Sequence, residues 1–247
     1  MQVAVVTGAS SGIGAAIARR LAADGWHCVL VARREAALRE LAGEIGGEVE
    51  TCDVTDRQAV ETAASRVRER HPAIGLLVNN AGFSARADFF TSEPERVEQV
   101  MQTNYLGSVW CLRAFLPALE AATPSHVVNI VSVAGTVALG ASGPYAASKH
   151  AQLAFSRSAA VALRPRGVHV HTINPGFVET PGFPQRARSR NRLWQRIVLE
   201  PDDVARRVLE VIASGKVEAT VPRWYRVGAL VQAVMPGLLV RLLGRRR

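Results

Sequence analysis

Cysteine is scarce in this sequence, and lysine is scarcer still. Cys28, Cys52 and Cys111 are the only cysteines among 247 residues, and no two of them form a CxxC pair. So few and so widely spaced thiols do not provide a disulfide framework or a metal site, and they indicate a reducing, cytoplasmic environment. The N-terminal MQVAVVTGAS has no charged region before its apolar run, so we interpret that run as a first strand and not as a signal peptide.

The basic residues are almost all arginine. Of 30 basic residues only Lys149 and Lys216 are lysines, and the net charge is +9. Such a balance allows binding of nucleic acid, anionic lipid or an acidic small molecule, and it fits equally well a solvated surface in an arginine-rich chain. Nucleic acid is disfavoured, because the sequence has no recognition motif and no basic stripe interleaved with aromatic residues.

Apolar runs of strand length alternate with segments of helical periodicity along most of the chain. Such repeated strand–helix units predict an α/β fold: a Rossmann-type, doubly wound parallel sheet with helices on both faces. The expected strands are 2–7, 27–32, 48–52, 74–82, 126–133, 168–176 and 216–221, and the longest expected helices are 93–120 and 145–163. We expect one catalytic domain over 1–222, with a substrate loop at 177–200, and a hydrophobic and basic extension at 223–247.

A glycine-rich stretch, TGASSGIG (7–14), lies where the first strand passes into a helix. Gly8 suits the tight turn, Gly12 lets the backbone approach a pyrophosphate, and Gly14 lets the helix pack closely on the strand. The helix N-terminus adds free N–H groups for phosphate. The spacing G-x-x-x-G-x-G differs from the common G-x-G-x-x-G and is compatible with a merely structural turn, but its position after the first strand favours dinucleotide binding.

The second expected strand ends in Ala32-Arg33-Arg34. A carboxylate at this point of a dinucleotide fold would bond the adenosine ribose and repel a 2′-phosphate. A guanidinium instead binds phosphate through two parallel hydrogen bonds. The arginines therefore predict NADP(H) over NAD(H); the alternative is that both are solvated residues at the start of a helix.

Tyr145 and Lys149 are one helical turn apart and share a helix face. A neighbouring ammonium stabilises phenolate and lowers the tyrosine pKa from its usual ~10. Lysine is a compact charge whose three donors can also reach a ribose, which explains its use in an arginine-rich chain. Taken alone, Y-x-x-x-K is common and would equally describe a solvated helix face.

Two further polar residues support this pair. Ser132 lies thirteen residues before Tyr145, at the expected end of an apolar strand, where its hydroxyl could hold a carbonyl oxygen. Asn104 lies in the long helix before that strand, where a buried amide could hold a water that links the lysine to solvent. Taken singly, each would more simply be a satisfied polar group at the end of an element.

Seven motifs stand in order: TGASSGIG, Asp53, NNAG (79–82), Asn104, Ser132, YAASK (145–149) and NPGFVET (174–180). Together they closely resemble the short-chain dehydrogenase/reductase family over residues 1–221. The resemblance implies a single Rossmann domain with a seven-stranded parallel sheet. It also implies a homodimer or homotetramer that associates through the helices at 93–120 and 145–163.

The resemblance also implies roles for individual residues. Tyr145 would be the general acid/base, Lys149 would bind the nicotinamide ribose and tune the tyrosine, Ser132 would orient the substrate carbonyl, and Asn104 would anchor a relay water. No catalytic position is substituted, and Arg33 matches the arginine typical of NADP-preferring members. The implied cofactor contacts are Gly8, Ser10, Ser11, Gly12, Ile13, Gly14, Arg33, Arg34, Asp53, Val54, Asn80, Ala81, Gly82, Tyr145, Lys149, Pro175, Gly176, Val178 and Thr180.

We therefore predict hydride transfer between NADP(H) and a carbonyl or alcohol, with Ser132 and Tyr145 contacting the substrate. The alternative, a non-catalytic NADP(H)-sensing module, has no need of a proton donor. The substrate region is expected at 83–90, 133–142 and 177–197, where the small, apolar stretch VAGTVALGASG favours a lipophilic ketone or aldehyde. The 177–197 segment also holds five arginines that would either meet an anionic group or lie in solvent: Arg186, Arg188, Arg190, Arg192 and Arg196.

The C-terminal stretch 224–247 is apolar with basic ends. Fourteen uncharged residues separate Arg226 from Arg241, and Pro236-Gly237 interrupts them. A spanning helix needs ~20 apolar residues, so this run is too short to cross a bilayer. Trp224 and Tyr225 at its start suit peripheral contact with a membrane interface; a surface for another subunit, or the substrate mouth, are the alternatives.

Overall fold

Seven strands form one parallel sheet in the order β3-β2-β1-β4-β5-β6-β7. The computed structural model describes residues 2–84, 87–138, 142–188 and 191–244. The strands are β1 (Val3–Thr7), β2 (His27–Ala32), β3 (Glu48–Thr51), β4 (Leu76–Asn79), β5 (Ser125–Ile130), β6 (Val168–Pro175) and β7 (Glu218–Val221). The doubly wound sheet predicted from the alternating pattern is confirmed, and its strand order reverses between β1 and β4, which opens a crevice at the carboxyl ends of the strands.

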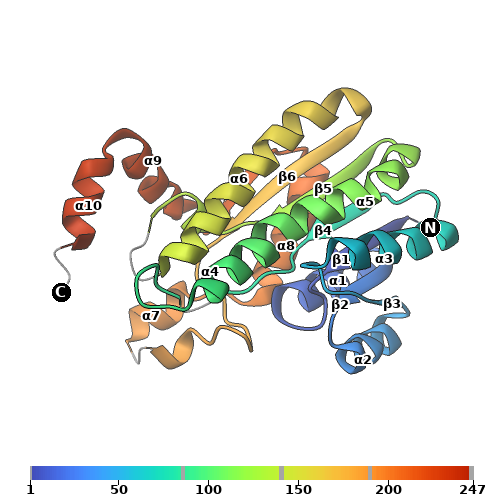
Figure 1. The fold of residues 1–247 in the computed structure, drawn as a ribbon, viewed down its shortest axis with the longest axis horizontal. Helices are drawn as coiled ribbons and strands as arrows, with labels where there is room; N and C mark the ends of the chain where they lie inside the picture. The colour runs from blue at the N-terminus through green and yellow to red at the C-terminus, as the bar shows by residue number, and fades with distance from the viewer. Residues whose placement is uncertain (1, 85–86, 139–141, 189–190, 245–247) are drawn as a thin grey trace.

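Helices cover both faces of the sheet (Figure 1). One face carries α1 (Gly12–Ala23), α2 (Glu35–Ile45) and α8 (Pro201–Ser214), and the other carries α3 (Arg57–Arg70), α5 (Gly107–Ala121) and α6 (Gly143–Leu163). Successive side chains along a strand point to opposite faces of the sheet. Val6 and Leu30 pack against the layer of α1, α2 and α8, and Val5 and Val29 pack against the layer of α3, α5 and α6. Because both faces are covered, the strands are apolar on both sides.

The single long helix expected at 93–120 consists of three joined segments. These are α4 (Pro94–Met101), the π-helical turn η1 (Gln102–Leu106) and α5. Asn104 lies in the π-helical turn and is completely buried. A π-helical turn inside a longer helix frequently marks a functional position.

Two expected strands are longer in the sequence interpretation than in the structure. β4 ends at Asn79, so Asn80, Ala81 and Gly82 form the loop that follows it. β5 ends at Ile130, and Ser132 caps the short 3-10 helix η2 (Val133–Gly135) by accepting from the Ala134 N–H at 3.1 Å. Apolar side chains continue past both strands, which is why periodicity alone places these ends too late.

The C-terminal extension forms helices that project from one end of the molecule (Figure 1). η6 (Arg223–Tyr225) leads into α9 (Arg226–Val234), and α10 (Pro236–Gly244) begins at the proline that interrupts the apolar run. The remaining short helices are η4 (Arg164–Arg166), η5 (Arg186–Arg188) and α7 (Arg192–Ile197). None of the helices in the described residues combines the length and the apolar character that a membrane-spanning segment requires. The terminal arginines 245–247 lie outside the described residues.

Candidate active site

The glycine-rich turn has the geometry expected from its sequence. Gly8 and Gly12 have φ values of +67° and +57°, which residues with a side chain rarely adopt. A Cβ on Gly14 would lie 2.4 Å from the Gly8 carbonyl oxygen and 2.5 Å from Asn80 Nδ2. α1 begins at Gly12, so Ser10, Ser11 and Ile13 stand at a helix N-terminus whose N–H groups are available to phosphate.

The loop after β4 is fastened to the end of β1 by a residue that the sequence interpretation did not single out. Thr7 Oγ1 donates to the Val78 carbonyl at 3.1 Å, and accepts from the Asn80 and Ala81 N–H groups at 3.0 and 3.1 Å. Asn80 Nδ2 in turn donates to the Thr7 and Gly8 carbonyls at 3.0 and 3.3 Å. These bonds bring the predicted cofactor floor next to the glycine turn. The sequence feature that could have identified Thr7 is its position as the first residue of TGASSGIG.

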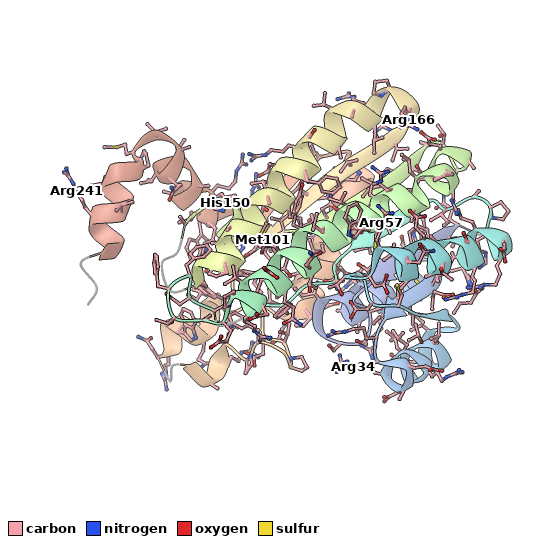
Figure 2. All side chains as sticks on the ribbon, viewed as in Figure 1. Arg34, Arg57, Met101, His150, Arg166 and Arg241 are labelled. Atoms are coloured by element: carbon pink, nitrogen blue, oxygen red, sulfur yellow. The ribbon has the colours of Figure 1, made fainter. Side chains whose placement is uncertain are left out.

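Arg34 reaches across the turn from the start of α2 (Figure 2). Its guanidinium donates to Ser10 Oγ at 3.0 and 3.2 Å and to Ser11 Oγ at 2.6 Å. Arg33 is also exposed, and its Nη1 atom lies 3.5 Å from Asp53 Oδ2. The structure therefore places the Arg34 guanidinium against the glycine turn and the Arg33 guanidinium beside Asp53, and their role toward a cofactor stays a prediction.

Asp53 and Val54 follow β3 and flank the same crevice. Burial raises the pKa of Asp53, but hydrogen bonds from the N–H and hydroxyl of Thr55 and the charge of Arg33 outweigh this effect and lower it. Val54 is buried, and a Cβ on Gly107 would lie 2.9 Å from its Cγ2 atom. The loop is thus packed against the start of α5.

Ser132 and Tyr145 meet at the carboxyl edge of the sheet. Burial raises the pKa of Tyr145, and the neighbouring Ser132 hydroxyl only partly opposes this increase. The expected lowering of the Tyr145 pKa is therefore wrong for this structure, because loss of solvent outweighs the attractive interactions of the phenolate.

Lys149 is buried beside this pair. Its Nζ atom donates to the Ile130 carbonyl at 3.0 Å and to Gln152 Oε1 at 2.8 Å, and lies 5.9 Å from the centre of the Tyr145 ring. Burial lowers the pKa of Lys149 to about 7. The side chain is therefore not fully charged at neutral pH, which removes part of the effect expected on the tyrosine. Gln152, which the sequence interpretation missed, lies one turn further along the same helix face.

Asn104 connects three parts of the site. Its Oδ1 atom accepts from the Phe83 N–H at 2.9 Å, and its Nδ2 atom donates to the Phe83 carbonyl at 3.1 Å and to Ser148 Oγ at 3.0 Å. A Cβ on Gly82 would lie 2.9 Å from Asn104 Oδ1 and 3.6 Å from Lys149 Nζ. The amide therefore holds the loop after β4 against α6, and its predicted role toward a relay water stays a prediction.

The segment after β6 closes over the glycine turn. Pro175 ends β6, and the Gly176 N–H donates to the Val221 carbonyl at 2.7 Å. Val178 is buried and pairs with Leu199, and the Thr180 Cγ2 atom lies 3.1 Å from where a Cβ of Gly12 would stand. The segment after β6 thus lies against the glycine turn, and its role toward the carboxamide stays a prediction.

Aromatic side chains gather above Gly176. Phe177 contacts Trp194 and Tyr225 at ring-centre distances of 4.8 and 6.3 Å, and Trp224 stacks on Tyr225 at 4.0 Å. A Cβ on Gly176 would lie 2.4 Å from Tyr225 Cε2. The start of the C-terminal extension is therefore part of the wall over the expected nicotinamide loop.

The extension also touches a second loop of the expected substrate region. Gln232 Oε1 accepts from the Ala138 N–H at 3.4 Å, and Val137 Cγ2 lies 3.6 Å from where a Cβ of Gly228 would stand. Of the predicted substrate segments, residues 85–86 and 139–141 lie outside the described residues.

Among the loop arginines whose side chains the structure describes, Arg186 is held by two acidic residues. Arg186 forms an ion pair with Glu200 at 2.5 Å, and its N–H donates to Glu179 at 2.8 Å. Arg190 lies outside the described residues. The ion pair occupies one guanidinium of the predicted anion-binding group.

A doubly wound sheet with this glycine turn and a hydroxyl pair beside a buried lysine defines the class of nicotinamide-dependent oxidoreductases. The chain belongs to the short chain dehydrogenase family, whose profile matches residues 2–191. A curated relative, dehydrogenase/reductase SDR family member 7B of Bos taurus, is 35% identical over 189 residues, which are 72% of this chain and 58% of the relative.

Two solved structures from Burkholderia species have the same fold. A short chain dehydrogenase from Burkholderia cenocepacia in complex with NADP is 28% identical, with a TM-score of 0.84 over 98% of this chain and 99% of that one. A short chain dehydrogenase/reductase from Burkholderia phymatum in complex with NAD is also 28% identical, with a TM-score of 0.84 over 96% of this chain and 94% of that one. The fold therefore accommodates both dinucleotides, and only the local contacts of the ribose can distinguish them.

Proposed function

We propose that this oxidoreductase is an NADP(H)-dependent carbonyl reductase that acts on a lipophilic ketone or aldehyde. The observation that carries the proposal is the convergence of Ser132, Tyr145 and buried Lys149 at the carboxyl edge of the sheet. A bound NADPH would supply the hydride, and the protein must then supply a proton to the carbonyl oxygen.

Tyr145 is suited to deliver that proton. Because burial raises its pKa, the side chain is a phenol at neutral pH and can donate to the oxygen that develops negative charge. We propose that the neighbouring Ser132 hydroxyl donates to the same oxygen. Lys149, with a pKa of about 7, gains and loses protons readily near neutrality and can restore the proton that Tyr145 gives up.

Lys149 also has a donor left for the cofactor. A protonated lysine has three N–H donors, and two of them point to Ile130 and Gln152. We propose that the third binds the nicotinamide ribose. The two protein bonds fix the direction of the ammonium group before any ligand arrives.

The crevice fits a dinucleotide on its own geometry. Two glycines with positive φ and the start of α1 form a cradle that a Cβ would fill, next to the loop that Thr7 holds. We propose that the N–H groups of this turn bind the pyrophosphate, that Asp53 and Val54 flank the adenine, and that the loop from Pro175 to Thr180 holds the carboxamide.

Arg33 and Arg34 support the preference for NADP(H). Both are exposed; Arg34 binds Ser10 and Ser11 of the glycine turn, and Arg33 lies beside Asp53. We expect Arg34→Ala to weaken NADPH binding by about 10-fold or more with little effect on NADH, since charge-assisted bonds contribute about 1.5–3 kcal/mol. Arg39→Ala is the matched control, because Arg39 is an exposed arginine of α2 that pairs with Glu35. Equal losses for NADPH and NADH would refute the preference.

The aromatic wall supports a lipophilic substrate. Phe177, Trp194 and Tyr225 stand above Gly176, and Phe89 packs on Gly143 at the start of α6, two residues before Tyr145. Binding of the substrate would be favoured when an apolar part of it, beside the reacting carbonyl, is buried against these aromatic side chains.

The direct test is loss of NADPH absorbance with a panel of lipophilic ketones and aldehydes. We expect wild type to turn over at least one class, Tyr145→Phe to lose about 100-fold or more in kcat, and Tyr105→Phe to keep wild-type turnover. Tyr105 is a partly buried tyrosine that packs on Phe155. NADPH binding without turnover by wild type would instead support a sensing module.

The outer face of the extension suits an anionic membrane surface. Val227, Leu230 and Val234 share one face of α9 and are 65–69% exposed, and Arg241 projects from α10 (Figure 2). Residues 223–247 contain six arginines and no acidic residue. We propose peripheral contact with anionic lipid, which would bring an apolar substrate to the mouth that the inner face of the same helices helps to form.

Sedimentation with anionic vesicles tests this contact. Leu230→Glu should reduce binding strongly, and Ala36→Glu, at an exposed alanine of α2, should not. Equal binding of both variants would contradict the proposal.

We also propose that α5 and α6 mediate a homodimer or homotetramer. Val161 and Val217 form an exposed apolar patch with Ala160 and Pro165. Light scattering that gives the mass of a monomer at micromolar concentration would contradict this.

A further inference from the structure

Three side chains with metal-binding atoms converge at the edge of the sheet opposite the catalytic crevice. His27 begins β2, Glu48 begins β3, and His71 caps the C-terminal end of α3. Glu48 pairs with Val29, and Val29 and His27 point to the same sheet face, which α3 covers. Residues far apart in the sequence thus meet at one point, next to the start of β1, where the His27 N–H donates to the Gln2 carbonyl.

The two imidazoles present the same nitrogen to the same oxygen. His27 Nε2 and His71 Nε2 each lie 2.8 Å from Glu48 Oε1, and the three atoms lie within 4.8 Å of one another. The ring centres are 5.3 Å apart and the planes are inclined by 49°. Two nitrogens and one carboxylate oxygen therefore face a common centre.

The other oxygen of Glu48 is already held. Arg70 Nε donates to Glu48 Oε2 at 2.9 Å, which directs Oε1 toward the imidazoles. The carboxylate is thus oriented, as a metal ligand with an outer partner usually is.

We propose that His27, Glu48 and His71 bind one divalent transition-metal ion of the Zn²⁺ type, with water at the fourth position. Two imidazoles and a carboxylate are a frequent zinc set, with bonds of about 2.0–2.2 Å. Tetrahedral ligands at such bond lengths stand ~3.3–3.5 Å apart, so each imidazole nitrogen, now 2.8 Å from Glu48 Oε1, would move about 0.5 Å away from that oxygen. On metal binding each imidazole would give up the Nε2 proton that it donates to Glu48, carry its remaining proton on Nδ1 and bind through the Nε2 lone pair.

The exposure of the three ligands and the charge around them determine how tightly the site should bind a metal ion. The side chains of His27, Glu48 and His71 are 17%, 31% and 18% exposed, so an ion can enter without unfolding. Glu50, which pairs with Arg66 and Arg70, is the next carboxylate on β3. Since the two glutamates and two arginines cancel in charge, no excess negative potential attracts a cation, and we expect affinity of micromolar order.

Bound metal would tie together the starts of β2 and β3 and the end of α3. Ion binding to the folded chain alone raises stability by mass action. The crevice lies at the carboxyl ends of the strands, whereas this site lies at their amino ends, so hydride transfer should be unaffected. The proposal is independent of the proposed function.

The test uses full-length protein without an affinity tag, freed of metal with EDTA and titrated with ZnCl₂ by calorimetry. We expect one zinc per chain and a melting temperature about 5–10 °C higher at ~100 times Kd. His71→Gln and Glu48→Gln should lower the affinity by roughly 100-fold, because loss of an outer partner alone costs 10–100-fold. His169→Gln is the matched control, since His169 is an exposed histidine on β6.

Urea unfolding in EDTA checks that the variants remain folded, and Co²⁺ substitution gives a second readout. Absorption bands of four-coordinate cobalt in wild type and His169→Gln, absent from His71→Gln, would support the site. No saturable zinc binding by wild type, or equal binding by wild type and folded His71→Gln, would overturn the proposal.

Discussion

Replacing Lys149 by methionine tests how deeply the lysine is buried in the site. Lys149 is 4% exposed, and burial lowers its pKa to about 7, against ~10.4 in an unfolded chain. Between these values the unfolded chain binds more protons than the folded chain, so the free energy of unfolding rises with pH. The destabilising effect of the ammonium is greatest below pH 7 and disappears above pH 10. Lys149→Met has no such group and should not show this gain.

The size of the effect follows from the same two pKa values. Between pH 7 and pH 9, the free energy of unfolding of wild type should therefore rise by about 2 kcal/mol more than that of Lys149→Met. Burial raises the pKa of the thiols of Cys28, Cys52 and Cys111, so wild type also loses stability as unfolded thiols ionise. Both proteins share these cysteines, and subtraction removes their contribution.

The assay is urea unfolding followed by circular dichroism at pH 7 and pH 9, without cofactor. Lys216→Met is the matched control, because Lys216 is the other lysine of the chain and is exposed; it should follow wild type. A difference between wild type and Lys149→Met that stays constant with pH, or that shrinks toward pH 9, would refute the reasoning.

Three further substitutions probe the site. Gly14→Ala places a Cβ 2.4 Å from the Gly8 oxygen, so we expect a loss of about 1–3 kcal/mol in urea unfolding and weaker NADPH binding by fluorescence; unchanged values would contradict the close packing. Thr7→Val leaves the Asn80 and Ala81 N–H groups without their acceptor and should cost about 1–3 kcal/mol in the same assay, whereas a neutral result would show that the loop after β4 is held otherwise. Ser132→Ala removes a hydroxyl that lowers the pKa of Tyr145, so the pH profile of alcohol oxidation should shift to higher pH; a profile in its wild-type position would argue against an interaction between Ser132 and Tyr145.

The fold was predictable because the chain marks its elements locally. The alternation of apolar runs and helical periodicity identified all seven strands, and TGASSGIG identified the passage from β1 to α1. Strand ends were less predictable. Ser132 turns away from β5 to cap η2 although its neighbours are apolar, and hydropathy does not distinguish a buried strand from a buried loop.

The composition of the site was predictable, whereas its energetics were not. The order of the motifs predicted that Ser132, Tyr145 and Lys149 share one site. The direction of the Tyr145 pKa shift, in contrast, depends on how much solvent the fold excludes from the phenol. Tyr225 covers Gly176 through a contact between residues far apart in the sequence, which no local pattern encodes. The meeting of His27, Glu48 and His71 likewise depends on strand register.

Hydride transfer in a single turnover is the most direct test of the account. Enzyme saturated with NADPH is mixed with an excess of a reducible ketone, and the loss of nicotinamide absorbance is followed by stopped flow. We predict that Tyr145→Phe binds NADPH with nearly wild-type affinity but transfers hydride about 100-fold or more slowly, because the carbonyl oxygen then has no phenolic proton to accept. Transfer at the wild-type rate by Tyr145→Phe would contradict the role of Tyr145 as proton donor.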